Sequence, residues 1–286
     1  MKLAILTPAP QYGADWRWAY DVEAQALERG GLDVTPLAWT TEDDLSAFDL
    51  VLPLVAWGYH EQYERWLRLL DRIDAHHTPI ANGTGTLRWN SDKAYLAELG
   101  SAGVSTVPTL AVDALDERGL AEAREHFSVA DLVVKPPVSA SAYGTYRLRD
   151  GDPFPEGVRG WRMLVQPWVQ AITDSGEYSL IFFDGEFSDA VSKIPKSGEF
   201  RVQPEYGGVI ARCDPPAGSL ELAKAALNRA PEAVTYARVD IVVGNDDRLQ
   251  IIELELIEPA LFLDHAPEAG AAFAAAVRSA VERSRK

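Results

Sequence analysis

Four charged side chains that could perform chemistry together lie near the C-terminal end of this sequence: Arg238, Asp240, Glu253 and Glu255. They belong to two apolar runs joined by an Asn-Asp-Asp turn, a pattern that predicts a β-hairpin. Side chains alternate between the two faces of a strand. A turn centred on residues 246–247 therefore places Asp240 opposite Glu253. The same register places Arg238 opposite Glu255, on the same face.

Three carboxylates gathered on one face of an apolar hairpin require a compensating charge, because like charges opposite each other destabilise a sheet. The simplest compensation is a bound cation. Oxygen ligands with no Cys or His nearby favour Mg²⁺, Mn²⁺ or Ca²⁺ over zinc. The hairpin therefore predicts a divalent-metal site formed by Asp240, Glu253 and Glu255.

Two lysines stand where an anionic partner is expected. Ser91-Asp92-Lys93 is predicted to open a helix that runs to Leu99, with Ser91 as its N-cap. Lys93 would then lie in the first helical turn, where a cation gains from a bound anion. Lys135 ends an apolar strand, where a buried lysine also needs an anion. The alternatives are a solvent-exposed Lys93 and an edge-strand Lys135 whose ammonium group reaches water.

Two loops could close around the same anion. The loop 139–144, with Ser139 and Ser141, consists mainly of small residues, so its backbone amides could approach phosphate oxygens closely. The loop 196–208 is polar, is flanked by glycines and carries Arg201. Such loops serve as mobile lids, although plain surface loops have the same composition.

The elements that must position these residues form three groups. In the first, strands alternate with helices, which predicts a doubly wound parallel sheet that ends near residue 90. Its strands are expected at 2–6, 33–39, 50–55 and 79–82, and its helices at 15–29 and 61–73. A small α+β unit follows, with strands at 106–112, 132–135, 145–148 and 163–167. The last group has strands at 178–183, 187–193 and 209–211 before the hairpin, and helices at 220–228 and 269–283.

Composition limits the classes of function. The chain has 286 residues with 47% hydrophobic content, enough to bury a full core. Its single cysteine, Cys213, rules out an internal disulfide framework and fits a reducing compartment, so we expect a cytoplasmic protein. The apolar run after Met1 is too short for a signal peptide or a membrane span. A net charge of −16 disfavours binding to nucleic acid.

Six short motifs, read in order, resemble the ATP-grasp superfamily, and they extend over nearly the whole chain. They are Trp89-Asn90-Ser91-Asp92-Lys93, Val134-Lys135-Pro136, Gln166-Pro167-Trp168-Val169, Gly176-Glu177-Tyr178-Ser179, Arg238-Val239-Asp240 and Glu253-Leu254-Glu255. The set is similar to the nucleotide-binding parts of glutathione synthetase and D-alanine–D-alanine ligase, and to a bacterial D-cycloserine synthetase-like subgroup. The resemblance implies an α/β ATP-grasp fold with a substrate domain (1–90), a small central domain (91–170) and a C-terminal domain (171–286).

The resemblance also implies roles for individual residues. ATP phosphates would be held by Lys93 and Lys135 with the loop serines Ser139 and Ser141, and the adenine by the hinge Gln166, Pro167, Trp168 and Val169. Glu177 would hold the ribose hydroxyls. Asp240, Glu253 and Glu255 would ligate two Mg²⁺, with Mn²⁺ as an alternative metal. Arg238, Arg201 and Lys193 would act on the transferring phosphoryl group. Many family members have Asn where this chain has Glu255, so the metal site carries an extra charge.

The implied activity is that of a carboxylate–amine ligase. A small-molecule carboxylate would be activated by ATP as an acyl phosphate and then attacked by an amine, giving an amide, a peptide-like bond or a closed ring. A small-molecule kinase and a catalytically silent nucleotide-binding regulator are the alternatives. The intact set of two lysines, an arginine and three carboxylates speaks against the silent regulator.

Three further expectations concern substrates, metal and assembly. The substrates should bind near the loops Pro8–Asp15 and Trp57–Tyr59, where strands of the first unit end. The hairpin carboxylates should bind Mg²⁺ weakly without nucleotide, and Arg238 should serve the chemistry rather than neutralise them. Homodimers are frequent among the proteins that the chain resembles.

Overall fold

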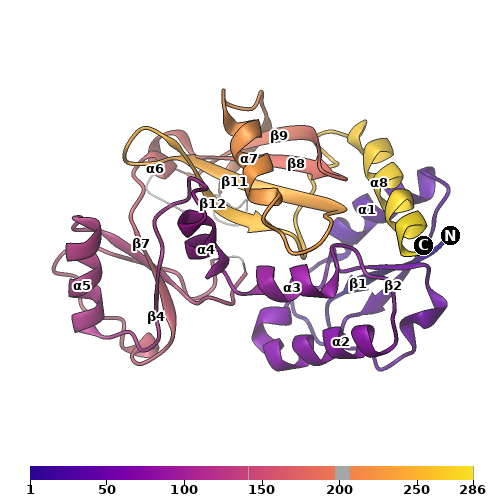
Figure 1. The fold of residues 1–286 in the computed structure, drawn as a ribbon, viewed down its shortest axis with the longest axis horizontal. Helices are drawn as coiled ribbons and strands as arrows, with labels where there is room; N and C mark the ends of the chain where they lie inside the picture. The colour runs from indigo at the N-terminus through magenta and orange to yellow at the C-terminus, as the bar shows by residue number, and fades with distance from the viewer. Residues whose placement is uncertain (141, 197–206, 286) are drawn as a thin grey trace.

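The computed structural model describes residues 1–140, 142–196 and 207–285. Its strands form three sheets, each with its own helical cover (Figure 1). Ser141, Arg201 and most of the expected lid at 196–208 lie outside the described residues. The mixed α/β composition agrees with the fold class that the sequence predicts.

The first sheet is parallel and has three strands in the order β2-β1-β3. These are β1 (Lys2–Thr7), β2 (Asp33–Ala38) and β3 (Leu50–Leu52), connected through α1 (Arg17–Arg29), and α2 (Tyr63–Ala75) follows. Two short 3₁₀ turns, η1 (Leu45–Ala47) and η2 (Tyr59–Gln62), flank β3. The strand expected at 79–82 is wrong: this segment adds only an isolated bridge from Ile80 to Val51. The chain leaves the sheet at Asn82, which has a left-handed φ of 67°.

The central sheet is antiparallel, with strand order β4-β7-β5-β6. Its strands are β4 (Leu110–Val112), β5 (Leu132–Lys135), β6 (Tyr146–Leu148) and β7 (Met163–Pro167), with a 3₁₀ turn, η3 (Glu156–Val158), before β7. The helix α5 (Glu117–Phe127) lies against this sheet at one end of the molecule (Figure 1). Leu120 and Ala123 of α5 share a separate small core with Val134 and Met163.

The third sheet is antiparallel, with strand order β10-β9-β8-β11-β12. It consists of β8 (Glu177–Phe183), β9 (Glu186–Ile194), β10 (Val209–Arg212), β11 (Tyr236–Val243) and β12 (Leu249–Glu255), with α6 (Ala171–Ser175) and α7 (Ser219–Leu227) beside it. The expected hairpin register is confirmed, because Asp240 pairs with Glu253 and Arg238 pairs with Glu255. A β-bulge next to Asp240 was not foreseen.

Two short helices connect the first sheet to the others, and they correct the prediction around Lys93. Helix α3 (Thr84–Ser91) ends where a helix was expected to begin, and α4 (Tyr95–Ser101) starts after Lys93. Ser91 is therefore the last residue of α3 and not an N-cap. The backbone turns between the helices because the Asp92 carboxylate accepts the N–H of Ala94 at 2.9 Å.

The C-terminal helix α8 (Ala269–Ser284) returns to the beginning of the chain and packs against α1 (Figure 1). Phe273 and Val277 of α8 share one buried core with Leu27 of α1, Leu3 of β1 and Phe183 of β8. The two chain ends consequently lie near each other. Within the described ranges, no helix combines the length and apolarity needed to cross a membrane.

Candidate ATP and metal site

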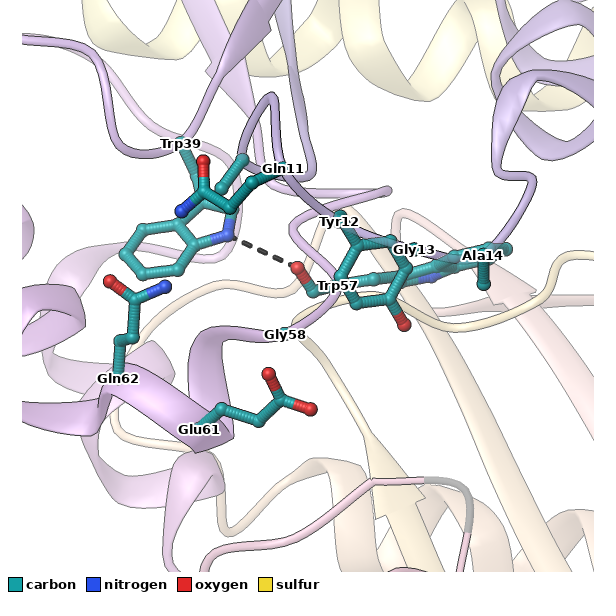
Figure 2. A pocket seen from close by; sticks show the side chains of 10 residues that line it. Gln11, Tyr12, Gly13, Ala14, Trp39, Trp57, Gly58, Glu61 and Gln62 are labelled. Atoms are coloured by element: carbon teal, nitrogen blue, oxygen red, sulfur yellow. Dashed lines mark hydrogen bonds between the residues drawn. The ribbon is translucent and has the colours of Figure 1, made fainter.

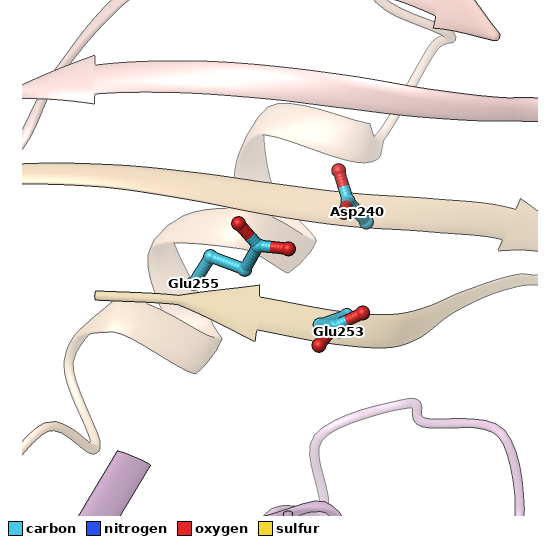
Figure 3. A group of neighbouring side chains, drawn as sticks. All are labelled: Asp240, Glu253 and Glu255. Atoms are coloured by element: carbon cyan, nitrogen blue, oxygen red, sulfur yellow. The ribbon is translucent and has the colours of Figure 1, made fainter. Parts of the chain in front are cut away.

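The hairpin brings three carboxylates together on one face. Oxygens of Asp240 on β11 and of Glu253 and Glu255 on β12 all lie within 4.8 Å of one another (Figure 3). Asp240 is buried, and the two glutamates are partly accessible from the cleft. Three carboxylates at this separation fit a hard divalent cation that prefers oxygen ligands. The sequence prediction of a shared carboxylate face is confirmed, while metal ligation itself stays a prediction.

Cationic side chains compensate these carboxylates in the structure. Arg238 donates from Nε to Asp240 Oδ1 at 3.0 Å and from Nη2 to Asp240 Oδ2 at 3.0 Å, and it also pairs with Glu255. The expectation that Arg238 takes no part in a neutralising ion pair is therefore wrong for this arrangement. Ser179 on β8 adds a hydrogen bond to Asp240, and it was missed because nothing in the sequence marks it.

Lys93 and Lys193 each pair with a different carboxylate of this cluster. Lys93 Nζ lies 3.0 Å from Glu253 Oε1 and donates to the backbone oxygen of Ser139 at 2.5 Å. Lys193 Nζ on β9 lies 3.3 Å from Asp240 Oδ2 and also pairs with Glu177. Lys193 thus pairs both with Asp240, an expected metal ligand, and with Glu177, the expected ribose contact.

The carboxylates differ in proton affinity because their neighbours differ. Burial alone would raise the pKa of Asp240, but Arg238 and Lys193 outweigh it and lower that pKa to about 2. Burial also opposes the ionisation of Glu253, yet Lys93 and Lys135 bring its pKa below the ordinary value. Burial raises the pKa of Glu255, and Arg238 offsets the rise only in part. Asp240 and Glu253 therefore ionise at lower pH than Glu255 does.

Lys135 differs from the other cations of the cleft. It is buried at the end of β5, and it forms no ion pair with any residue in the described part of the chain. Burial is the main reason that its pKa falls to about 8. A buried ammonium group without a carboxylate partner is poised to receive an anion.

The loop after β5 is placed beside Lys93, as the sequence suggests. The Ser139 side chain is buried, and its hydroxyl donates to the Pro136 carbonyl at 3.3 Å. Its carbonyl accepts from Lys93. In this arrangement Ser139 shapes the loop, and its hydroxyl does not extend into the cleft.

The hinge residues 166–169 join the central sheet to the third sheet. The buried Gln166 side chain donates to Thr109 at 2.8 Å. The Trp168 backbone N–H donates to Asp131 at 3.0 Å, and the Trp168 carbonyl accepts from Asn245 at 2.7 Å. These Trp168 backbone groups are therefore already engaged in hydrogen bonds within the protein.

A cavity of about 320 Å³ opens where β1 and β3 end, between the two loops that the sequence marks as substrate candidates (Figure 2). It is lined by Gln11, Tyr12, Trp39, Trp57, Glu61 and Gln62 together with small residues. The Trp39 indole donates to the Trp57 carbonyl at 3.1 Å and fixes one wall. Among the described residues, the lining contains one carboxylate and no cation. Glu61 was missed because nothing distinguishes it from other surface glutamates.

Glu258, three residues beyond β12, interacts electrostatically with a residue of this cavity and with the carboxylate cluster. Its Oε2 atom is buried and has no hydrogen-bond partner among the described residues. Burial, followed by the charge of Glu255, raises its pKa to about 8. Glu258 also contributes to the raised pKa of Tyr12, which lines the cavity. The sequence gives no signal for this residue apart from its place after the hairpin.

Comparisons with known proteins agree with this arrangement. Residues 3–82 match the family model described as the N-terminal domain of D-cycloserine synthetase DcsG. The chain is 29% identical to the cycloserine biosynthesis protein DcsG of Streptomyces lavendulae, an alignment that covers 96% of this chain and 97% of that protein. The crystal structure of D-cycloserine synthetase DcsG superposes with a TM-score of 0.83 and 25% identity, over 99% of this chain and 100% of the other.

More distant structures share the fold. The D-alanine–D-alanine ligase of Bacillus anthracis complexed with ATP matches with a TM-score of 0.71 and 15% identity, over 100% of this chain and 98% of that one. The ATP-grasp ligase PsnB in complex with precursor, Mg and ADP matches with a TM-score of 0.65 and 13% identity, over 98% of both chains. The ordered motifs, the carboxylate cluster and these relatives agree: the chain has the fold of the ATP-grasp ligases, and its similarity to DcsG over nearly its whole length supports an ATP-dependent ligase that forms C–N bonds.

Proposed function

We propose that this enzyme activates a small-molecule carboxylate as an acyl phosphate and passes the acyl group to an amine, within one substrate or between two. The observation that carries the proposal is the cluster of Asp240, Glu253 and Glu255 facing Lys93 and Arg238. Such a cluster can hold metal and triphosphate together. Mg²⁺ would take the place of a cationic side chain beside a carboxylate, and phosphate would take the place of a carboxylate beside a cationic side chain.

Binding of MgATP would exchange the partners in the cleft. The phosphates would pair with Lys93 and Lys135. Asp240, Glu253 and Glu255 would ligate two Mg²⁺, for which Mn²⁺ can substitute. Each cation that leaves a carboxylate gains a phosphate oxygen, so few charges stay uncompensated. Metal alone or nucleotide alone would leave one set of charges unpaired, which explains why the two ligands should bind together.

The remaining roles follow from position. Pro167 and Val169 offer backbone groups to the adenine beside the buried Gln166 side chain, with Trp168 holding the hinge. Glu177 receives the ribose hydroxyls, and Lys193 couples it to Asp240. Ser139 shapes the loop over the phosphates. Ser141 and Arg201, outside the described residues, are proposed as a further loop contact and a cation that closes from the lid.

The chemistry proceeds in two displacements. A substrate carboxylate oxygen attacks the γ-phosphorus, the bond from that phosphorus to the bridging oxygen breaks, and ADP leaves. Arg238 and Lys135 compensate the negative charge on the transferring group, and bound Mg²⁺ supplies Lewis-acid stabilisation of the same charge. The amine nitrogen then attacks the acyl carbon, loses a proton and expels phosphate.

The substrate carboxylate and amine would reach the cluster from the cavity between the loops after β1 and β3. Glu61, Tyr12 and Trp57 suit an uncharged or cationic part of the substrate, because no cation among the described lining residues would hold an anion there. The carboxylate would point toward Arg238 and Lys135. We further propose the division into domains at 1–90, 91–170 and 171–286, with α8 bridging the last to the first, and a homodimer in the cytoplasm.

Substrate-dependent ADP formation tests the proposal. Purified enzyme with ATP, Mg²⁺ and a panel of amino acids and dipeptides should release phosphate with some carboxylates. Hydroxylamine should trap the activated carboxylate as a hydroxamate. A stable phosphorylated product without hydroxamate would favour the kinase alternative. The absence of ADP with every carboxylate of the panel would favour a silent nucleotide-binding protein.

A further inference from the structure

The outer edge of β12 is bonded in an unusual way. β12 is the last strand of its sheet, and an edge strand ordinarily presents unpaired N–H and C=O groups. Here the backbone groups that face outward beside Glu253 and Glu255 are bonded by side chains of the segment 82–95. Because this segment includes Lys93, one short stretch of chain contacts β12 and also carries the lysine proposed to bind the ATP phosphates.

Three buried polar side chains make these bonds. The Tyr95 hydroxyl accepts from the Leu254 N–H at 2.8 Å and donates to the Leu254 carbonyl at 2.9 Å. Asn90 donates to the same carbonyl at 2.7 Å and accepts from the Leu256 N–H at 2.9 Å. Asn82 donates to the Leu256 carbonyl at 2.7 Å. Their exposed fractions are 1% for Tyr95, 6% for Asn90 and 1% for Asn82.

These bonds fix the backbone on both sides of Glu255. Leu254 lies between Glu253 and Glu255, and Leu256 follows directly. Successive side chains of a strand point to opposite faces, so the leucines enter the core while the glutamates enter the cleft. Lys93, which pairs with Glu253 at 3.0 Å, stands between Asn90 and Tyr95 in the sequence. The distance between phosphate-binding and metal-binding groups therefore depends on Asn90 and Tyr95.

We propose that Asn90 and Tyr95 are positioning residues that set the affinity and selectivity of the metal site by fixing the carboxylates of Glu253 and Glu255 relative to Lys93. This inference rests on the proposed function, in which those carboxylates bind Mg²⁺. Mg²⁺ demands near-ideal octahedral geometry at short distances, whereas Ca²⁺ accepts irregular and longer contacts. If the backbone of β12 is held less firmly, the affinity for Mg²⁺ should consequently fall more than the affinity for Ca²⁺.

The test uses Tyr95→Phe, which removes the hydroxyl and keeps the packed ring. Calorimetry should measure binding of a non-hydrolysable ATP analogue to the enzyme in the presence of Mg²⁺ and, separately, of Ca²⁺. We expect the affinity measured with Mg²⁺ to fall by roughly tenfold or more, the size found for residues that orient metal ligands. The affinity measured with Ca²⁺ should change much less, and the Mg²⁺ concentration needed for half-maximal turnover should rise in parallel.

Tyr63→Phe is the matched control. Its hydroxyl hydrogen-bonds to Ser91 of α3 at 3.2 Å, and among the described residues it forms no hydrogen bond to β12. It should leave the Mg²⁺-to-Ca²⁺ affinity ratio unchanged. Asn90→Ser, which keeps a shorter hydrogen-bonding group, is the second variant if Tyr95→Phe does not fold, and it should shift the ratio in the same direction.

Two results separate this inference from the proposed function. Lower unfolding stability with an unchanged Mg²⁺-to-Ca²⁺ ratio in a folded variant would show that Tyr95 and Asn90 only stabilise the fold, and it would overturn the inference. Glu253→Gln in the same titration tests the metal assignment itself. If that variant binds Mg²⁺ as the unmodified enzyme does, the carboxylate assignment fails, and the inference fails with it.

Discussion

At the scale of single residues, the cleft holds nearly balanced charges. Arg238, Lys93 and Lys193 each pair with at least one carboxylate. Lys135 differs, since it has no carboxylate partner among the described residues and burial lowers its pKa to about 8. This difference leads to a specific dependence of nucleotide binding on pH.

Nucleotide affinity should weaken above pH 8 because of Lys135. Below its pKa of about 8 the ammonium group is charged and can pair with phosphate, whereas above it binding must first take up a proton. The dissociation constant of a MgATP analogue should therefore rise, approaching tenfold for each further pH unit. Titration calorimetry between pH 7 and pH 10 measures this slope.

Two variants identify the group responsible for the slope. Lys135→Met should bind weakly at every pH and lose the dependence. Glu258, whose pKa is raised to about 8, titrates in the same range as Lys135 and is the competing group, and Glu258→Gln should keep the dependence. A slope that survives in Lys135→Met and disappears in Glu258→Gln would contradict the assignment.

Glu253→Gln should lower Mg²⁺-dependent ATP turnover by at least a hundredfold and change stability little. The amide keeps the shape of the side chain but loses the charge that attracts metal, and such electrostatic contacts are worth a few kcal/mol in the transition state. Steady-state phosphate release and urea unfolding measure the two effects. Glu221→Gln on the exposed side of α7 is the control. Full activity of Glu253→Gln would exclude Glu253 as a ligand.

At this scale the sequence predicts which residues lie on the same face of the hairpin, but it does not predict which side chains form ion pairs and hydrogen bonds with one another. The opposition of Asp240 and Glu253 follows from strand alternation and turn position alone. The ion pair between Arg238 and Glu255 depends on side-chain conformation, and Ser179 reaches Asp240 from a different strand. No spacing rule specifies contacts between side chains of separate elements, so these partners appear only in three dimensions.

At the scale of elements, the strand that carries Glu177 directly follows a glycine at a position where a side chain has no room. Gly176 has φ of 76°, and a Cβ there would overlap the Lys193 carbonyl. Gly176→Ala should therefore destabilise the protein by roughly 2–4 kcal/mol, combining left-handed backbone strain with the overlap. Urea unfolding measures the loss.

Gly185→Ala provides the matched control. Gly185 lies in the turn between β8 and β9 with φ of 81°, and a Cβ there would meet nothing within 4 Å. Its cost should be only the backbone strain of about 1–2 kcal/mol. Equal losses in the two variants would show that the contact with Lys193 is unimportant.

Boundaries were predicted closely for several strands, but β3 ends at Leu52 instead of residue 55, β4 begins at Leu110 instead of residue 106, and the segment around Lys93 was also misplaced. Apolar runs bounded by turns gave β1, β5, β7 and the hairpin to within about two residues. The helix expected from Ser91 failed because Ser91 and Asp92 resemble a start signal, while the chain uses Asp92 to turn between two helices. The strand expected at 79–82 failed because Asn82 turns the chain toward β12.

At the scale of the whole molecule, α8 joins the two ends of the chain. Its apolar face packs on α1 and on residues of β8, so the first and third sheets share one core. Periodicity predicts the helix but not its partner, because an apolar face has the same pattern whichever surface it covers. The domain boundary expected at residue 171 therefore does not predict that α8, from the C-terminal domain, packs against α1 of the first domain.

Glu23, a carboxylate buried on α1, should make global stability depend on pH. Its Oε2 atom has no hydrogen-bond partner among the described residues, and burial raises its pKa well above 4.5. The folded protein keeps the neutral acid, whereas the unfolded chain ionises, so stability should fall as the pH rises from about 4.3. At pH 8, Glu23→Gln should be more stable than the unmodified protein by roughly 1–3 kcal/mol.

The difference between the two proteins should vanish near pH 4, where the acid is neutral in both states. Denaturant unfolding at several pH values provides the comparison, with Glu28→Gln on the exposed face of α1 as the control. A constant difference between Glu23→Gln and the unmodified protein at all pH values would show that Glu23 does not titrate on unfolding.

The central claim is that a substrate carboxylate attacks the γ-phosphorus of ATP. Isotope transfer tests it most directly, with a carboxylate that supports ADP formation labelled with ¹⁸O at both oxygens. Mass spectrometry of the released phosphate should find one ¹⁸O atom from the substrate in each phosphate, because the acyl carbon–oxygen bond breaks in the second step. Unlabelled phosphate accompanying amide product would contradict an acyl phosphate and overturn the account.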